Sequence, residues 1–327
     1  MSDEAFGLLF DDIRSARFTS LADVASPPHL ADLSDPAHDA LLATVDVLIT
    51  SWGAPRFDAG LLARMPRLRA VFHAAGSVRP HVTEAFWERG LQITSAAEAN
   101  AVPVAEFTLA AILFAGKRVL PQVRSPRTDA ASWGDQLRRR AIGNVDRTIG
   151  IVGYSRIGRR VVDLLRPFDG LRVLVADPFA DAEEVTAAGA ALTTLERMLP
   201  RVDVLSLHAP DLPSTFWMIS APQLAALPDG ATVINTARGA LLDHDALLAE
   251  ARTGRIDALL DVTDPEPLPA DSPLHDLPNV TITPHLAGSL GTETRRLTDM
   301  ALSELEAFVN GATPLFPVRE ADLGLSA

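Results

Sequence analysis

Short apolar runs alternate with amphipathic stretches along most of the chain. In the first 98 residues, four apolar runs predict strands and two amphipathic stretches between them predict helices. The runs are Phe6–Phe10, Val45–Thr50, Leu68–His73 and Leu91–Thr94, and the helical stretches are Asp58–Met65 and Val82–Arg89. Prolines 27, 28 and 36 predict a loop between Asp23 and Asp39. The pattern predicts a small α/β unit.

A helix that is apolar on nearly every side is predicted over residues 103–118. Such a helix has no face suited to water, so we expect it to be buried within a domain or between subunits. Residues 119–147 then lose their periodicity and become rich in arginine around Trp133. We expect an arm there, at an oligomer contact.

Strand and helix patterns alternate again from residue 148. Strands are predicted at 149–152, 172–177, 202–207, 231–235, 257–262 and 280–283, and a last helix at 293–309, which ends at Asn310-Gly311. This alternation predicts parallel strands joined by crossover helices on both faces, which is a doubly wound α/β sheet.

The turn after the first of these strands is rich in glycine. Gly153 and Gly158 occupy the first and third glycine positions of a dinucleotide-binding turn, and Ser155 stands at the second. The helix that follows would point its free N–H groups at a phosphate. The alternative is a packing corner without a ligand. A P-loop fits less well, because it needs a lysine after the last glycine and the chain's one lysine is Lys117.

An acidic residue ends the next predicted strand. Asp177 follows Gly158 by 19 positions, the spacing at which a carboxylate accepts hydrogen bonds from the adenosine ribose. A 2′-phosphate would meet a like charge there, so Asp177 favours NAD over NADP. The alternative is an aspartate that only begins a loop.

Composition narrows the classes of protein and partner. The 327 residues, 47% of them hydrophobic, suffice for two domains, and the lack of cysteine excludes thiolate catalysis and fits a cytoplasmic protein. A net charge of −13 opposes nucleic-acid binding, and the basic run Gln136–Arg140 is interpreted as a solvated face. The longest apolar run, Leu109–Gly116, is shorter than the ~18 residues of a membrane span, so we expect no membrane partner.

Three chemically useful residues follow three predicted strands. Arg238 comes after the strand at 231–235, Glu266 after that at 257–262, and His285 after that at 280–283. Ligands of doubly wound sheets bind beyond the carboxyl ends of the strands, so these side chains should line one rim. Taken singly, the histidine could be a structural loop residue and the arginine a cap contact.

Several motifs in this region resemble the NAD-dependent D-2-hydroxyacid dehydrogenase family. They are Asn235-Thr-Ala-Arg-Gly239, Leu260-Asp-Val-x-x-Pro-Glu-Pro267 and Thr283-Pro-His-Leu-Ala-Gly288, with Leu207-His-Ala-Pro210 and the stretch from Asn100 to Thr108. The resemblance implies a Rossmann cofactor domain at 99–289. It also implies a smaller flavodoxin-like α/β substrate (catalytic) domain made of 1–98 and 290–327, and a homodimer.

The resemblance assigns catalytic roles to the rim. Arg238 would bind the substrate's carboxylate and carbonyl oxygen, a bidentate task that suits a guanidinium. His285 would donate a proton to the keto oxygen during reduction and remove it during oxidation, while hydride moves to or from the nicotinamide. Glu266 would hold the imidazole in position.

The resemblance also implies two sets of binding residues and no metal site. For NAD they are Gly153, Ser155, Arg156, Ile157, Gly158, Asp177, His208, Ala209, Pro210, Thr236, Ala237, Asp261, His285, Ala287 and Gly288. For the substrate they are Ala75, Gly76, Ser77, Asn100, Arg238 and His285. Ala75 and Ser77 replace the family's usual Gly-x-Gly, and Thr263 stands where an aromatic residue is common, so we expect an atypical pocket.

We therefore expect a cytoplasmic oxidoreductase that transfers hydride between NAD(H) and a small 2-hydroxy or 2-keto acid, with D stereochemistry by resemblance. Glyoxylate, hydroxypyruvate and phosphoglycerate all stay open as substrates. The alternative is an NAD-sensing interaction protein like the family's corepressors, which keep the same three residues. The acidic chain with its single lysine favours the enzyme.

Overall fold

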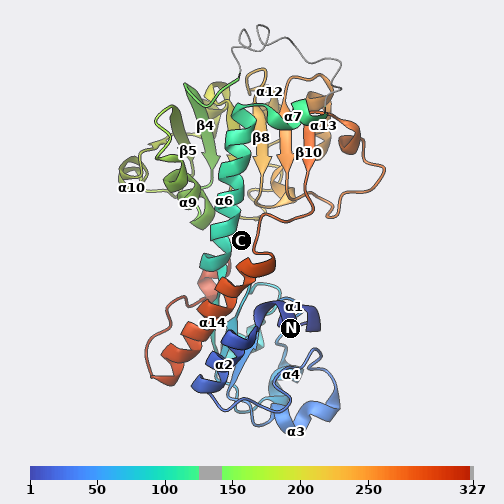
Figure 1. The fold of residues 1–327 in the computed structure, drawn as a ribbon, viewed down its shortest axis with the longest axis vertical. Helices are drawn as coiled ribbons and strands as arrows, with labels where there is room; N and C mark the ends of the chain where they lie inside the picture. Colours follow the sequence, from blue (N-terminus) through green and yellow to red (C-terminus); the bar gives the residue numbers. More distant parts are fainter. Residues whose placement is uncertain (125–141, 325–327) are drawn as a thin grey trace. The chain divides into compact units, whose positions relative to one another are not determined.

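The computed structural model describes residues 1–124 and 142–324. Two compact units divide the chain: unit 1 is Met1–Asn100 with Ser289–Ala327, and unit 2 is Ala101–Gly288. Each unit is an α/β structure with a parallel sheet, as expected (Figure 1). Trp133 and the run Gln136–Arg140 lie outside the described residues, so the expected arm stays a prediction.

Unit 2 contains a doubly wound parallel sheet. Among the described residues it has seven strands in the order β10-β9-β8-β7-β4-β5-β6. They are β4 (Arg147–Val152), β5 (Leu171–Ala176), β6 (Ala191–Leu192), β7 (Val204–Leu207), β8 (Thr232–Asn235), β9 (Asp257–Leu260) and β10 (Val280–Ile282). Strands buried on both faces read as continuous apolar runs, which is why the sequence predicts them well.

Helices cover both faces of this sheet (Figure 1). They are α6 (Ala97–Gly116), α7 (Val119–Arg124), α9 (Arg156–Leu165), α10 (Ala182–Ala187), α11 (Leu195–Met198), α12 (Ala221–Ala225) and α13 (His244–Arg252), with short 3₁₀ turns η3 (Leu199–Arg201), η4 (Gly239–Leu241) and η5 (Pro273–Asp276). Alternate residues of a strand divide between two cores: Ile151 of β4 packs in the core with α6 and α9, whereas the next residue, Val152, packs in the core with α11, α12 and α13. This division follows from the two-residue period of a strand.

Helix α6 is longer than the sequence predicts. It begins at Ala97 and continues through Pro103, the residue at which the predicted helix begins. Its length and apolar composition would suffice to cross a membrane, but half of the relevant window is buried. Ala111 and Ile112 pack in one core with Ile149 and Ile151 of β4. Burial against the sheet explains the lack of a polar face.

Unit 1 is built from both ends of the chain. Its described part has a parallel sheet in the order β1-β2-β3, formed by β1 (Val47–Thr50), β2 (Ala70–His73) and β3 (Gln92–Ser95). Its helices are α1 (Asp3–Leu9), α2 (Asp12–Leu21), α3 (Asp39–Leu42), α4 (Ala59–Arg64), α5 (Glu84–Glu88) and α14 (Thr294–Val309), with 3₁₀ turns η1 (Pro36–His38), η6 (Gly291–Glu293) and η7 (Glu320–Gly324).

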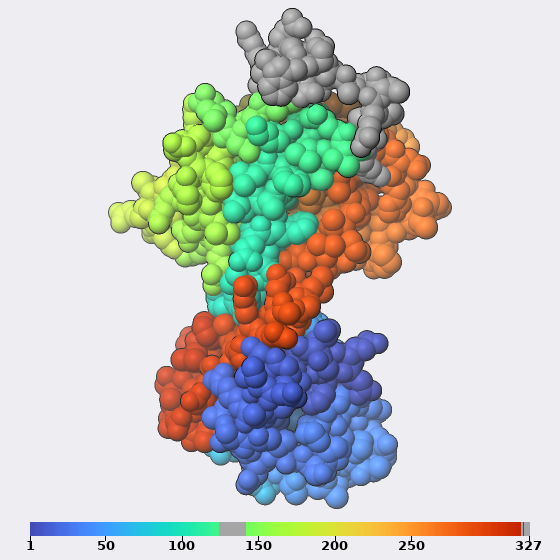
Figure 2. All heavy atoms as spheres, viewed as in Figure 1, coloured from blue at the N-terminus to red at the C-terminus, as the bar shows by residue number. Residues whose placement is uncertain are grey.

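The two ends of the chain meet in unit 1 where α14 packs against α1 and α2. Figure 2 shows these segments side by side on one face, in red and blue. Arg14 of α2 donates from Nη2 to the Asp299 carboxylate of α14 at 2.6 Å. The first and last helices therefore belong to one folding unit.

One predicted strand is wrong. Residues Phe6–Phe10 were expected to be extended, but α1 spans Asp3–Leu9. The Ser2 hydroxyl caps this helix by accepting the Ala5 N–H, and Asp3 and Glu4 place negative charge in its first turn. A short apolar run satisfies both helical and strand periods, so the cap decides between them. Similarly, α7 lies at the start of the stretch predicted to be irregular.

Candidate active site

The strand order of unit 2 reverses at β4. The chain adds β5 and β6 on one side and then returns to place β7 on the other side of β4. Ligands of doubly wound sheets bind beyond the carboxyl ends of the strands at such a reversal. The two loops that frame this point touch, because a Cβ on Gly153 would lie 2.6 Å from the backbone N of Ala209. Gly153 therefore permits the turn and the loop to approach closely.

The glycine turn has the geometry of a phosphate-binding corner. Gly153 has φ +94°, and a Cβ on Gly158 would overlap the carbonyl oxygen of Gly153. Ser155 has ordinary extended backbone (φ −72°), and its Oγ accepts the Gly158 N–H at 3.4 Å as the N-cap of α9. No glycine is needed at position 155, and the serine hydroxyl hydrogen can still be donated to a phosphate oxygen. These residues fit the pyrophosphate of a dinucleotide.

Asp177 lies at the end of β5, beside this turn. Its Oδ2 accepts the Tyr154 N–H at 2.7 Å and its Oδ1 accepts the Phe179 N–H at 2.8 Å. The carboxylate is thus fixed in place by the backbone on both sides. Each oxygen has a second lone pair for a ribose hydroxyl, so the arrangement fits NAD.

His208 lies in the loop after β7 that contacts Gly153. Its Nε2 is 2.8 Å from the Ser206 Oγ, and burial lowers the pKa of His208 to about 3. Among the described residues its buried Nδ1 has no hydrogen-bond partner. A neutral imidazole at physiological pH cannot serve as the proton donor for a keto group. We therefore assign His208 to the cofactor-binding loop and not to proton transfer.

The loop after β8 presents Arg238. Asn235 holds this loop, because its Oδ1 accepts the Ala237 N–H at 3.1 Å and its Nδ2 donates to the Arg238 carbonyl at 2.9 Å. The Arg238 Nη1 donates to the Ala237 carbonyl at 2.6 Å, which uses one of five guanidinium donors. The arginine is therefore positioned before any substrate arrives.

A buried pair of hydroxyl groups fixes the same loop to α6. The Thr236 and Thr108 hydroxyl oxygens are 2.9 Å apart, and Thr108 also donates to the Val104 carbonyl at 2.8 Å. Since Thr108 has one hydrogen to donate, Thr236 is the donor between the two.

Gly239 brings the Arg238 loop against the loop that carries Glu266. A Cβ at this position would overlap the carbonyl carbon and oxygen of Thr263 and would lie 2.6 Å from the Asp264 backbone N. The two backbones therefore touch at Gly239. This contact sets where the Arg238 loop and the Glu266 loop lie relative to each other.

Glu266 and His285 form a direct pair. The Glu266 Oε1 lies 2.5 Å from the His285 Nδ1, and the two side chains are 39% and 53% exposed, so both are open to a ligand. His285 has φ +52°, an uncommon conformation for a residue with a side chain. Its N–H lies 3.0 Å from each of the Asp261 and Thr283 carbonyl oxygens.

Asp261 organises the loop around His285. Its Oδ1 accepts the Thr283 hydroxyl at 2.6 Å and the Leu286 N–H at 2.8 Å, and its Oδ2 accepts the Ala287 N–H at 2.9 Å. The side chain is buried. The sequence assigned Asp261 to the cofactor, and the structure adds a set of contacts that hold the His285 loop.

The residues expected to bind substrate at 75–77 and 100 lie in unit 1. Gly76 and Asn100 are close, since a Cβ on Gly76 would be 3.7 Å from the Asn100 Nδ2. The Ala75 carbonyl accepts the Ala96 N–H at 3.0 Å, and the Asn100 Oδ1 accepts the Ser289 N–H at 3.0 Å. The structure thus brings the 75–77 loop and Asn100 together.

Two structural contributions were missed by sequence reasoning. Gly239 and Thr108 both lie inside motifs quoted above, but the motifs give no hint of a backbone contact with Thr263 or a hydroxyl contact with Thr236. A glycine directly after a candidate binding residue was the available signal for the first contact. In residues 1–124 and 142–324, no group of three or more metal-ligating side chains gathers.

Comparison with known proteins gives a consistent result. Residues 109–287 match the family model of the D-isomer specific 2-hydroxyacid dehydrogenase, NAD binding domain. D-3-phosphoglycerate dehydrogenase of Mycobacterium bovis is 32% identical over 300 residues, which cover 86% of this chain and 55% of that protein. The chain therefore spans about half the length of this relative.

Two further relatives match nearly end to end. Glyoxylate reductase of Aeropyrum pernix is 32% identical over 302 residues, which cover 89% of this chain and 87% of that protein. The crystal structure of the TT0316 protein from Thermus thermophilus superposes with a TM-score of 0.70 at 32% identity, over 87% of this chain and 90% of that one.

Proposed function

Because this chain belongs to the D-isomer specific 2-hydroxyacid dehydrogenase family, we propose that it transfers hydride between NAD(H) and a small 2-hydroxy or 2-keto acid of D stereochemistry. The observation that carries the proposal is the Glu266–His285 pair, whose Glu266 loop touches the Arg238 loop at Gly239. A proton donor, its carboxylate partner and a fork for an acid group come from three neighbouring strand ends, beside a turn that fits a dinucleotide.

His285 is the acid and base. Its Nδ1 faces the Glu266 carboxylate, so Nε2 is the nitrogen that meets the substrate. During reduction the Nε2 proton passes to the keto oxygen, and during oxidation Nε2 takes the hydroxyl proton. Glu266 keeps the ring oriented through its contact with Nδ1. NADH, when bound, supplies the hydride.

Arg238 binds the acid group. Its guanidinium presents parallel N–H donors to the carboxylate and to the neighbouring oxygen, which fixes the carbon that changes oxidation state. We propose that Ala75, Gly76, Ser77 and Asn100 of unit 1 also contact the substrate.

The cofactor residues follow from the turn and the rim. Gly153, Ser155, Arg156, Ile157 and Gly158 would hold the pyrophosphate, and Asp177 the adenosine ribose. The segments 208–210, 236–237 and 287–288, with Asp261 and His285, would surround the rest of the cofactor. The fixed carboxylate of Asp177 supports NAD rather than NADP.

We further propose that the protein acts as a homodimer in the cytoplasm, on small-molecule substrates and without nucleic-acid or membrane partners. The net charge of −13 supports the absence of nucleic acid. The packing of the apolar helix α6 against β4 supports the absence of a membrane partner, because it gives this helix a place in the protein core.

The test is NADH consumption against glyoxylate, hydroxypyruvate, pyruvate and bulkier 2-keto acids. We expect turnover with at least one of them, and we expect His285→Ala to lower kcat by about 10²–10⁴-fold while NADH binding persists. Near-full turnover by His285→Ala in both directions would overturn the assignment. Tight NADH binding without turnover on any acid would instead indicate an NAD-sensing protein.

A further inference from the structure

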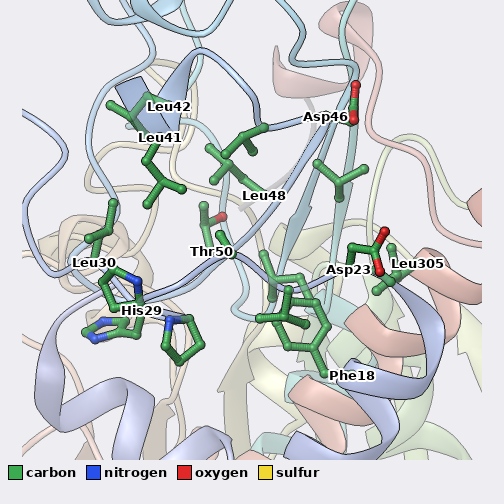
Figure 3. A pocket seen from close by; sticks show the side chains of 18 of the residues that line it. Phe18, Asp23, His29, Leu30, Leu41, Leu42, Asp46, Leu48, Thr50 and Leu305 are labelled. Atoms are coloured by element: carbon green, nitrogen blue, oxygen red, sulfur yellow. The ribbon is translucent and has the colours of Figure 1, made fainter. Parts of the chain in front are cut away.

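Unit 1 contains a cavity of about 650 Å³ that lies outside the residues assigned above. Its walls come from β1, from the helices and loop of residues 6–44, and from the end of α14 (Figure 3). Ligand sites commonly have volumes of ~300–1,000 Å³ and mostly apolar walls. The size of this cavity is that of a small-molecule site.

The cavity lies against β1, an edge strand of the unit 1 sheet. Val47, Leu48 and Ile49 are only partly buried, whereas every residue of β2 is buried. An apolar run of this kind is normally covered on both faces in a parallel sheet. Here Leu48 and Thr50 face the open space, with Phe18 and Leu305 on one side and Leu30 and Leu41 on the other (Figure 3). Apolar ligand atoms would complete this cover.

Charged side chains at the cavity are few, and most have partners. The α-amino group of Met1, another lining residue, is partly buried, and this burial lowers its pKa. The Arg67 Nη2 donates to the Asp46 carboxylate at 2.8 Å, so these two charges offset each other. The His29 Nε2 lies 2.9 Å from the Met1 carbonyl oxygen, and its ring stacks on Phe6. Within the part of the chain that the structure describes, the Asp23 carboxylate has no hydrogen-bond or ion-pair partner.

Asp23 sets the charge of the preferred ligand. This residue lines the cavity and is exposed, so its carboxylate lies where the cavity opens to solvent. A free carboxylate attracts a cation and repels an anion, and the net charge of −13 adds to both effects. We propose that the cavity binds a small apolar molecule that carries an amine, with its apolar body against β1 and its ammonium group at Asp23. The same charge disfavours the anionic 2-hydroxy acids of the proposed reaction at this cavity.

Three molecules with the same chain length test the charge preference. Calorimetric titration of the full chain with n-octylamine, n-octanol and n-octanoate at pH 7 should give the tightest binding for the amine, weaker binding for the alcohol and the weakest for the carboxylate. Equal affinity for n-octanoate and n-octylamine, or no measurable binding of the amine, would overturn the proposal.

Two variants locate the site. Asp23→Asn should weaken n-octylamine about three- to fivefold, the size of an exposed ion pair, and leave n-octanol unchanged. The matched control is Asp12→Asn, because Asp12 is exposed at the start of α2 and does not line the cavity. Leu48→Trp, which fills the cavity from β1, should abolish binding of both molecules. Equal effects of Asp23→Asn and Asp12→Asn would place the amine elsewhere, as would unchanged binding by a folded Leu48→Trp.

Discussion

The glycine-containing loops of unit 2 and the 75–77 loop of unit 1 differ in how closely their surroundings pack. The central strands of both sheets are equally buried, because every residue of β7, β8 and β9 in unit 2 and of β2 in unit 1 is buried. In unit 2, however, glycines at 153, 158 and 239 lie where a single Cβ would overlap or crowd neighbouring backbone, whereas the nearest atom to a Cβ on Gly76 of unit 1 would be 3.7 Å away. The candidate catalytic loops are thus held by contacts that tolerate no added atom, whereas the 75–77 loop has room.

The largest expected effect comes from adding one carbon in the crowded unit. Gly239→Ala should destabilise unit 2 by about 3 kcal/mol, because the new Cβ meets the Thr263–Asp264 backbone, which cannot rotate away as a side chain can. Gly76→Ala is the matched change in unit 1, and its free energy of unfolding should stay within ~0.5 kcal/mol of that of the parent protein. Chemical unfolding measures both. Equal losses would remove the contrast between the units.

Acid should affect the two units alike. Burial lowers the pKa of His73 in unit 1 and of His208 in unit 2 from 6.5 to about 3. The unfolded chain binds these protons below pH 6.5 and the folded chain does not, so stability is complete above that pH and falls as the pH drops toward 3. Each buried histidine should lower the free energy of unfolding by about 2 kcal/mol at pH 5.

Unfolding at pH 7.5 and pH 5 checks this expectation. His73→Asn should reduce the acid sensitivity of unit 1, and His208→Asn that of unit 2. A pH-independent stability in the parent protein would contradict buried neutral imidazoles in both units.

A smaller effect separates hydrogen bonding from crowding in unit 2. Asp261→Asn replaces one carboxylate oxygen by an NH₂ group, which leaves a backbone N–H unsatisfied at a cost of about 1–3 kcal/mol. If Asp261 mainly holds the His285 loop, kcat should fall about tenfold or more with little change in NADH affinity. A loss confined to NADH affinity would assign it to the cofactor alone. Asp264→Asn, an exposed neighbour, serves as the control.

The smallest effect is expected at Ser155. Its backbone is extended and its hydroxyl caps α9 over a long 3.4 Å bond, so Ser155→Gly should change NADH affinity and stability by less than about 1 kcal/mol. Fluorescence titration with NADH measures the affinity. A larger loss of NADH affinity would show that the Ser155 hydroxyl donates to the pyrophosphate.

The sequence predicts the parts of the fold that depend on local pattern. The buried strands β7 to β9 follow from their apolar runs, and helix α9 follows from the strand, glycine turn and helix pattern that begins at residue 149. Phe6–Phe10 was predicted wrongly, because a run of four apolar residues and Gly7 fits a helix and a strand equally well and the Ser2 cap favours the helix.

Long-range contacts could not be predicted in the same way. The contact of Gly239 with Thr263 and the bond from Thr236 to Thr108 join segments that only the folded sheet brings together. The open edge of β1 is a similar case, since its sequence reads as a strand that is fully covered. Local pattern specifies that a residue prefers burial but not which neighbour provides it.

The contact at Gly239 has a consequence for protein engineering. Since the Arg238 and Glu266 loops touch backbone to backbone at Gly239, a library that varies this position would mostly return destabilised chains. The 75–77 loop, which we propose contacts the substrate and which has free space around Gly76, is the better place to diversify when a new acid is to be accepted. New substrate ranges in this scaffold should therefore arise by changing unit 1 while the residues around His285 are left untouched.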